Sequence, residues 1–331
     1  MATIASDVGA AAPPPSPRRR LRGPKWGLAL PAWFWFVFFF LVPVAFIVVY
    51  SFGYKPQAGA KGAVGLDRLS WDNYSKVLDT SGPLYETFRQ TLIIAVTGTV
   101  LCLLIAFPFA YWLAAKVPPK WKGVLLALII VPFWTSFLIR TIAWRIVLAP
   151  KGLLASWLQQ LGAVNGPLSI LDTRQAVQIG VVYNYLPLMI FPLYVTLDRL
   201  DPALREASKD LGASRWRTFS QVTLPLSMPG VVAGLLLVYI PLAGDYITAS
   251  VLGGAKGNMV GALVASQFQA AQNQPLGSAM AVVLIAMILF SIAVVAVVAL
   301  LIRWAVRRVR GIDIGEGGPA LPIAGTAGAA A

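Results

Sequence analysis

The stretch WFWFVFFFLVPVAFIVVY, residues 33–50, contains no charged residue and decides the class of fold. It lies inside a longer uncharged run between Lys25 and Lys55. A helix of about 20 residues, rising about 1.5 Å per residue, crosses a hydrocarbon core of about 30 Å. The run therefore predicts a membrane-spanning helix over residues 30–52. Because it is too long for a signal peptide and no convincing small-residue cleavage site follows, we expect a retained anchor.

The composition of the whole chain also indicates a membrane protein. Of its 331 residues, 58% are hydrophobic and only 12% are charged, whereas soluble domains carry about 25% charged residues. The net charge of +14 does not indicate nucleic-acid binding, because the basic residues lie between long apolar runs. The chain has no histidine and one cysteine, Cys102. We therefore expect no metal site, no disulfide and no histidine-based catalysis.

Five further segments have the character of membrane spans. The second lies between Arg89 and Lys116, the third starts after Lys122, the fourth lies between Arg174 and Asp198, the fifth starts near Pro229, and the sixth ends at Arg303. The third is marginal, because its uncharged run at 123–139 is 17 residues long. Arg140 must then lie near a membrane surface or inside the bundle. The predicted fold class is all-α, a polytopic membrane protein with six transmembrane helices.

The distribution of lysine and arginine predicts the orientation of these spans. With the N-terminus inside, the inner segments hold 17 of the 27 cations, and an excess of these residues marks cytoplasmic loops. Both termini should then be cytoplasmic, with residues 115–122 and 198–228 inside and residues 55–86 and 253–275 outside. We expect a disordered basic leader at 1–28, a six-span membrane domain at 29–304 and a cytoplasmic tail at 305–331. An outer stretch, LLASWLQQLG at 153–162, has an apolar stripe that favours a short helix in the membrane interface.

The segment DRLDPALREASKDLGASRWRTFSQVTLPLSMPG, residues 198–230, lies between the fourth and fifth spans and is the most informative about function. Asp201 followed by Pro202 predicts a helix start, because aspartate caps a helix and proline fits its first turn. Gly212 should end this helix.

A second helix should follow at once in the same segment. Ser214 can cap it, and apolar residues recur at helical spacing until Pro225 and Pro229 break the pattern. The sequence therefore predicts two short helices at an angle, lying across the cytoplasmic mouth of the bundle rather than spanning the membrane.

The same residues carry a family resemblance. Glu206-Ala207-Ser208, then Gly212, then Val222-Thr223-Leu224-Pro225 resemble the EAA loop of ABC importer permeases, whose pattern is Glu-Ala-Ala, three residues, Gly, nine residues, Ile, any residue, Leu-Pro. Ser208 replaces the second alanine and Val222 replaces isoleucine. PFWTSFLIRTIAW at 132–144, GDYITASVLGG at 244–254 and NMVGALVASQF at 258–268 resemble the spermidine/putrescine branch of these permeases.

The resemblance implies that this loop is a coupling helix, which sits in a groove of a cytoplasmic ATPase subunit. On that basis Ala207 and Ser208 allow close docking, Glu206 supplies a salt bridge or a capping contact, and Gly212 fixes the turn. The alternative is an ordinary amphipathic loop that covers the end of the bundle. The residues assigned to ATPase coupling are Glu206, Ala207, Ser208, Gly212, Arg215, Leu224 and Pro225.

The resemblance also implies the remaining parts of a transport system in the bacterial inner membrane. The implied partners are a cytoplasmic ABC ATPase dimer, a periplasmic substrate-binding protein and a second permease subunit. A different chain is favoured for this second permease over a copy of this one, and both alternatives stay open. The sequence has no Gly-rich stretch ending in Gly-Lys-Ser/Thr. We therefore expect a transporter subunit that is not an enzyme and binds no cofactor, with ATP and Mg on the partner ATPase.

The implied substrate is a small organic cation, namely a polyamine such as spermidine or putrescine. Another amine, an amino-acid derivative or an iron complex stays open as an alternative. An ion-coupled secondary transporter is a second class of function, but no internal repeat with paired broken helices is apparent in the sequence.

Asp245 is the only acidic residue within a predicted span, in its outer half. Pro241 and Gly244 precede it and predict a broken helix, which a membrane tolerates where the freed backbone faces a cavity. Asp245 is therefore a candidate cation site. The alternative is an ion pair with Arg140 or Arg145.

Polar and aromatic residues of other spans complete the candidate pathway. Aromatic faces attract ammonium groups, although packing between helices explains tyrosines in a span equally well. Arg140 is a poor ligand for a cation, so we expect it to make a structural pair or to contact an outer partner. The pathway candidates are Asp245, Tyr246, Tyr183, Asn184, Tyr185, Arg140 and Trp144.

Overall fold

The computed structural model describes residues 25–56, 64–162 and 166–310. Within these ranges the regular structure is helical, apart from one isolated bridge between Tyr54 and Gly65. Five helices are long and apolar enough to cross a membrane, and a bent pair makes a sixth if it counts as one span. The predicted all-α polytopic class is confirmed. Most of the predicted leader and tail, at 1–24 and 311–331, lies outside the described residues.

The chain divides into two compact units, Met1–Phe46 and Ile47–Ala331. The described part of the first unit contains α1 (Lys25–Phe36), η1 (Val37–Leu41) and the start of α2 (Val42–Ser51). Leu30–Ser51 has the length and hydropathy of a membrane span, in agreement with the predicted 30–52. Its apolar side chains are largely exposed in this chain, a surface that is stable in lipid and unfavourable in water.

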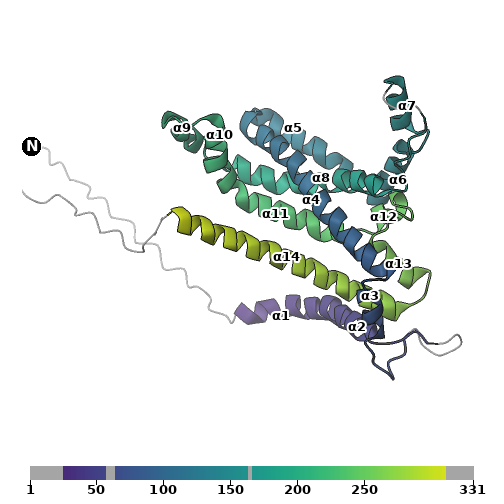
Figure 1. Ribbon diagram of the computed structural model, residues 1–331. Helices are drawn as coiled ribbons and strands as arrows, with labels where there is room; N and C mark the ends of the chain where they lie inside the picture. The colour runs from purple at the N-terminus through teal and green to yellow at the C-terminus, as the bar shows by residue number, and fades with distance from the viewer. Residues whose placement is uncertain (1–24, 57–63, 163–165, 311–331) are drawn as a thin grey trace, which may run out of the picture. The chain divides into compact units, whose positions relative to one another are not determined.

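Three long helices form the centre of the second unit (Figure 1). They are α4 (Pro83–Lys116), α8 (Arg174–Asp198) and α11 (Leu224–Ala243), and each packs against the other two. On α11, a Cβ atom at Gly230 would lie 2.7 Å from the Pro192 carbonyl oxygen of α8, so this crossing requires glycine. Small residues on membrane helices let backbones approach closely. Along α4 they are buried at every fourth position, at Gly98, Cys102, Ala106 and Ala110.

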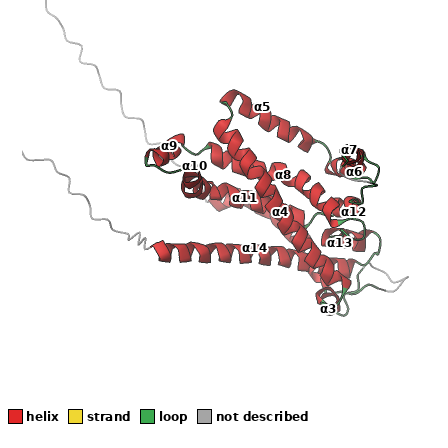
Figure 2. Ribbon diagram, turned by 45° about the horizontal axis from the view of Figure 1, so that its top comes forward, coloured by secondary structure: helices red, strands yellow, loops and turns green. Residues whose placement is uncertain are grey.

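The two ends of this bundle carry different elements, and Figures 1 and 2 agree on their placement. At one end lie α9 (Pro202–Asp210) and α10 (Arg215–Thr218). At the other end lie α6 (Phe137–Val147), α7 (Leu153–Gln160), α12 (Ile247–Leu252) and α13 (Val260–Gln269). The predicted coupling segment is therefore separated from the segments predicted to lie outside. Which end faces the cytoplasm stays a prediction from the charges.

Two further helices pack against each other at the end of the bundle that carries α13. These are α3 (Asp72–Leu78) and α14 (Gln274–Arg310), which also packs against α13. The Tyr239 and Ser291 hydroxyls, 2.6 Å apart, join α11 to α14. The sixth predicted span is thus a single long helix.

The predicted third span exists only as a bent pair of helices. α5 (Pro119–Ile130) leads into a short 3-10 turn, η2 (Val131–Trp134), and α6 then leaves at 90° to that segment. Pro132 lacks an N–H donor and its ring opposes continuation of the helix. Thr135 then adopts extended backbone, and Ser136 is also non-helical, before α6 begins.

The fifth span begins earlier than predicted. α10, a π-helical turn η3 (Phe219–Thr223) and α11 form one helix, Arg215–Ala243. The expectation that Pro225 and Pro229 end a separate short helix is therefore wrong. The wider π-turn relieves the clash between a proline ring and the carbonyl four residues earlier. The same solution recurs at Pro43, which η1 precedes in the same way.

The predicted interfacial segment does form a helix, α7. Leu153, Trp157 and Leu161 are exposed on one stripe, and Gly162 follows with a φ of +69°. A left-handed glycine is a common way to end a helix. Its location in the membrane interface stays a prediction.

Candidate functional site

The segment between α8 and α11 is capped as the sequence predicts. Oδ1 of Asp201 accepts a hydrogen bond from the Ala203 N–H at 2.9 Å, and Pro202 occupies the first turn of α9. Gly212 has a φ of +80°, in the left-handed region that favours glycine. Helix α9 therefore begins and ends where the capping residue and the glycine predict.

Ser208 joins α9 to α10. Its hydroxyl oxygen lies 3.1 Å from that of the buried Thr218, and its carbonyl accepts the Ala213 N–H at 3.1 Å. Ser214 caps α10, because its Oγ accepts the Arg217 N–H at 3.3 Å. An alanine at position 208 could not make the hydroxyl contact. This role of Ser208 was not predicted, since nothing in the segment signals that Thr218 would face it.

The α9–α10 end of the bundle exposes large apolar side chains. Leu211 is 89% exposed, Trp216 is 76% exposed and Leu204 is 48% exposed. Exposed apolar groups gathered in one place mark interaction sites. The coupling candidates exposed on the same segment are Glu206, Ala207, Gly212 and Arg215.

Leu224 and Pro225 lie apart from that surface. They are the first residues of α11, directly after the π-turn, so they belong to the span rather than to a loop. Of the predicted coupling set, these two therefore connect the α9–α10 segment to the membrane helix.

Asp245 lies at the predicted break, between α11 and α12, and is only 6% exposed. Its Oδ1 accepts the Thr248 N–H at 2.9 Å and its Oδ2 accepts the Thr248 hydroxyl. The Tyr185 hydroxyl approaches the carboxylate from α8. No ion pair joins Asp245 to Arg140 or Arg145 in the described part of the chain. Asp245 thus caps α12, and the alternative of an ion pair is not realised.

Arg145 has partners elsewhere. Its Nη1 lies 3.5 Å from Oδ1 of Asp172 and also donates to the carbonyl of Val251. The Asp172 N–H donates in turn to the Leu252 carbonyl at 3.1 Å. These contacts join α6, α12 and the residues that precede α8 at one end of the bundle.

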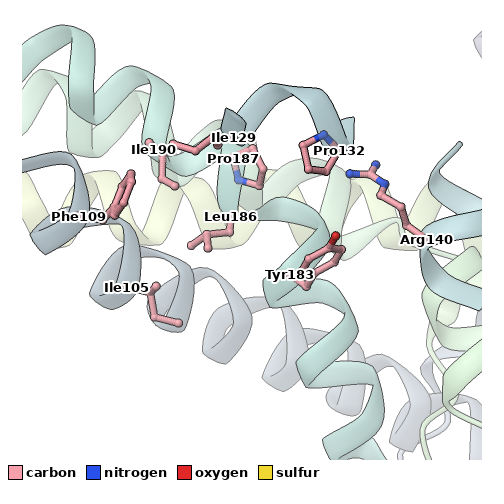
Figure 3. A pocket seen from close by; sticks show the side chains of 9 residues that line it. All are labelled: Ile105, Phe109, Ile129, Pro132, Arg140, Tyr183, Leu186, Pro187 and Ile190. Atoms are coloured by element: carbon pink, nitrogen blue, oxygen red, sulfur yellow. The ribbon is translucent and has the colours of Figure 1, made fainter. Parts of the chain in front are cut away.

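Arg140 borders an apolar cavity of about 250 Å³, called here the Arg140 cavity. Its guanidinium carbon lies 4.9 Å from the ring centroid of Phe133 and 5.7 Å from that of Phe137. Arg140 is 8% exposed, and its Nε has no hydrogen-bond partner among the residues described. The cavity is lined by Ile105, Phe109, Ile129, Pro132, Arg140, Tyr183, Leu186, Pro187 and Ile190 (Figure 3).

Two other pathway candidates adjoin this cavity. Tyr183 lines it, and the Trp144 ring meets the Tyr183 ring edge-on with centroids 5.3 Å apart. The structure therefore brings Arg140, Trp144 and Tyr183 together. Tyr246 is 47% exposed beside the break that carries Asp245.

Asn184 and Tyr185 point into the bundle. The Asn184 amide donates to the Thr141 hydroxyl at 3.2 Å, while its Oδ1 is buried without a partner among the described residues. The Tyr185 hydroxyl donates to the Pro241 carbonyl at 3.4 Å. Asn184 therefore joins α8 to α6, and Tyr185 joins α8 to the end of α11.

Two features of this site could have been found in the sequence. The spacing of Asp245 and Thr248 is that of a helix cap whose side chain accepts the N–H three residues later. Phe133 and Phe137 lie seven and three residues before Arg140, and aromatic faces suit a guanidinium. The 90° bend that brings both rings to Arg140 has no such local signal.

Comparison with known proteins gives consistent results. Residues 106–311 match the family described as "Binding-protein-dependent transport system inner membrane component". The chain is 41% identical over 251 residues to the spermidine/putrescine transport system permease protein PotB of Salmonella typhimurium, covering 76% of this chain and 85% of that protein. It is 40% identical to PotB of Escherichia coli K12, covering 76% and 88%. The inner membrane ABC transporter permease protein YdcU of the same organism is 34% identical, covering 64% and 71%.

Solved structures share the fold. The chain resembles one chain of a bacterial ABC transporter involved in the import of the acidic polysaccharide alginate, with a TM-score of 0.61 and 15% identity, covering 81% of this chain and 93% of that one. A second alginate transporter structure, in complex with a pentasaccharide-bound periplasmic protein, gives a TM-score of 0.58 and 16% identity, covering 80% and 91%.

Proposed function

Because the chain belongs to the family of binding-protein-dependent transport system inner membrane components, we propose that its cargo is a polyamine, spermidine or putrescine. The observation that carries this proposal is the 41% identity to a spermidine/putrescine permease over 76% of the chain. The chain is a permease subunit of an ABC importer, and a separate subunit hydrolyses ATP.

The α9–α10 segment is the contact for that ATPase. Leu204, Leu211 and Trp216 supply exposed apolar surface there, and Glu206 and Ala207 are accessible beside them. Two such segments, one from each permease subunit, engage an ATPase dimer that binds ATP and Mg. The tie between Ser208 and Thr218 transmits displacement of α9 to α10, and α10 is continuous with the fifth span. Closure of the ATPase dimer then moves that span.

Asp245 is the residue that meets the cationic cargo. An ionised carboxylate offers about four acceptor positions, and Thr248 occupies two of them. The others can accept ammonium N–H groups, while the nearby Tyr185 and Tyr246 present aromatic faces. Because Asp245 is only 6% exposed, the cargo reaches it when α11 and α12 move apart at the break. That requirement fits alternating access.

The complete importer contains a second permease subunit, a different chain rather than a copy, and a periplasmic protein that delivers the cargo. Both termini of this chain face the cytoplasm. The charge distribution supports this orientation, and the opposite placement of α9–α10 and α12–α13 is compatible with it.

Uptake into proteoliposomes tests the proposal. The chain is reconstituted with the second permease, the ATPase and the binding protein of its transport system. Uptake of labelled spermidine, putrescine, a neutral amino-acid derivative and a ferric complex is then compared. ATP-dependent uptake confined to the polyamines is expected. Uptake of only the ferric complex or the amino-acid derivative would reassign the cargo and leave the family unchanged.

A further inference from the structure

Arg140 carries an uncompensated charge near the middle of the bundle. The Arg140 cavity is lined by residues 183–190 of α8, and Leu186 lies 12 residues from each end of that helix, about 18 Å at 1.5 Å per residue. The ion pairs among the described residues use Lys122 and other arginines, and the Arg140 guanidinium lies over the rings of Phe133 and Phe137. A charge at such depth is costly and is normally paired.

The start of α6 adds to this positive potential. Ser136 makes no side-chain cap, and the N–H groups of Phe137, Leu138 and Ile139 find no acceptor in the part of the chain that the structure describes. Uncapped N–H groups at a helix start attract anions. The Arg140 side chain points back over this turn toward Pro132 (Figure 3). Two independent features therefore favour an anion at the same place.

The broken segment beside Arg140 is unsuited to lipid. Between η2 and α6 the backbone leaves helical geometry, and irregular backbone at membrane depth must be covered by protein or face a water-filled cavity. Nevertheless, this chain leaves Trp134 87% exposed, Ile139 65% exposed and Val131 62% exposed. A second protein surface that covered these residues would also shield the irregular backbone from lipid.

The lining of the Arg140 cavity argues against a water-filled path for a cation. Of its nine lining residues only Arg140 and Tyr183 are polar. An arginine repels a cationic cargo, whereas a bidentate carboxylate matches its fork of N–H donors. The apolar walls and the single buried guanidinium of the Arg140 cavity are suited to bind an acidic side chain that belongs to an apolar helix of another protein.

We propose that the broken third span, residues 131–140, is a contact face for the second permease subunit, and that Arg140 with the uncapped start of α6 receives a carboxylate side chain from it. This inference rests on the proposed assembly with a second permease. It commits Arg140 to the subunit interface instead of the cargo pathway.

Photo-crosslinking tests the contact face. p-Benzoylphenylalanine replaces Trp134 or Ile139, and the complete transporter is irradiated in membranes. The matched control is Phe290 of α14, which is 71% exposed but lies on another span. Crosslinks to the second permease from 134 and 139, and none from 290, are expected. If intact wild-type complex is recovered but neither position crosslinks to that subunit, the proposed face is wrong.

Substitution of Arg140 tests the charge. Arg140→Gln should lower the amount of second permease that co-purifies with the tagged chain by about tenfold or more, as expected when a buried charge pair loses one member. Arg140→Lys should retain much of it. Arg145→Gln is the control, because Arg145 pairs inside its own chain. Equal yields of monodisperse chain establish that each variant folds.

If Arg140→Gln is unstable, exchanging the charges of Arg140 and its proposed acidic partner still tests the ion pair. Arg140→Glu combined with arginine at the acidic residue of the crosslinked peptide should restore assembly. Normal assembly of Arg140→Gln with altered uptake would place Arg140 in the pathway and contradict the inference. If even the wild-type chain recovers no second permease, the proposed assembly itself fails, which is a different result from a missing crosslink.

Discussion

Asp245 and Arg140 are both buried charged residues, but they differ in their hydrogen-bond partners. Asp245 is satisfied by Thr248 within three residues of itself, whereas Arg140 has aromatic faces and an unpartnered Nε. A carboxylate that caps a helix can keep that contact and still accept a cation. We therefore expect substitution of Asp245 to change transport more than folding.

Asp245→Asn should abolish most ATP-dependent spermidine uptake while the complex still assembles. The amide oxygen can still accept the Thr248 N–H, so the cap survives while the charge is lost. Thr248→Val is the control, because it removes one donor and leaves the carboxylate. It should cost about 1 kcal/mol of stability and keep uptake. Normal uptake by a stable Asp245→Asn complex would remove Asp245 from the pathway.

At the scale of elements, the α9–α10 segment combines an exposed apolar surface with a fixed turn. Gly212 holds the turn at a φ of +80°, and a Cβ atom there would meet nothing within 4 Å. A side chain at 212 therefore acts through backbone strain, of about 1–2 kcal/mol, rather than through a clash.

Gly212→Val and Glu206→Lys should each abolish uptake and cargo-stimulated ATP hydrolysis, with the chain still present in the membrane. The first changes the direction of the turn, and the second reverses a charge on the docking surface. Gly123→Ala on α5 is the matched control, because its Cβ would also meet nothing within 4 Å and its backbone is helical. Normal coupling in both variants would disprove the assignment of this segment.

Ser208→Ala should loosen α9 from α10 without removing the docking surface. The lost hydroxyl contact with Thr218 is worth about 1 kcal/mol. Hydrogen exchange at the amides of 203–211 should become faster by a few-fold, with ATPase binding retained. Unchanged exchange would show that the hydroxyl contact does not hold the two helices together.

Local chemistry made part of this architecture predictable. The caps at Asp201 and Ser214 and the turn at Gly212 depend on a few neighbouring residues, and the structure has all three. Most spans followed from uncharged length alone. The coupling and pathway roles of the candidate residues stay predictions.

The outcome at the prolines could not be predicted in the same way. Pro132 breaks a span, yet Pro225 is accommodated by a π-turn within one. Which occurs depends on how neighbouring helices satisfy the freed backbone groups. The bend of the third span also decides whether an arginine can reach Asp245. No short stretch of sequence predicts that bend.

For the whole molecule, the charge distribution predicts which surfaces are accessible from each side. A cysteine at Leu69, which is 67% exposed, should react with an impermeant thiol reagent added outside intact cells. A cysteine at Leu211, which is 89% exposed, should react only after the membrane is opened. Wild-type protein is the control, because Cys102 is fully buried. Labelling of both positions from outside would overturn the six-span orientation.

The continuous helix Arg215–Ala243 has the proposed ATPase contact near one end and the Asp245 break at the other. Its 29 residues extend about 43 Å at 1.5 Å per residue. A tilt of about 5° around one end displaces the opposite end by about 4 Å, roughly the width of one methylene chain. A rotation too small to unpack neighbouring helices can therefore admit or exclude a slender, unbranched cargo, and bulkier molecules would demand a far larger swing.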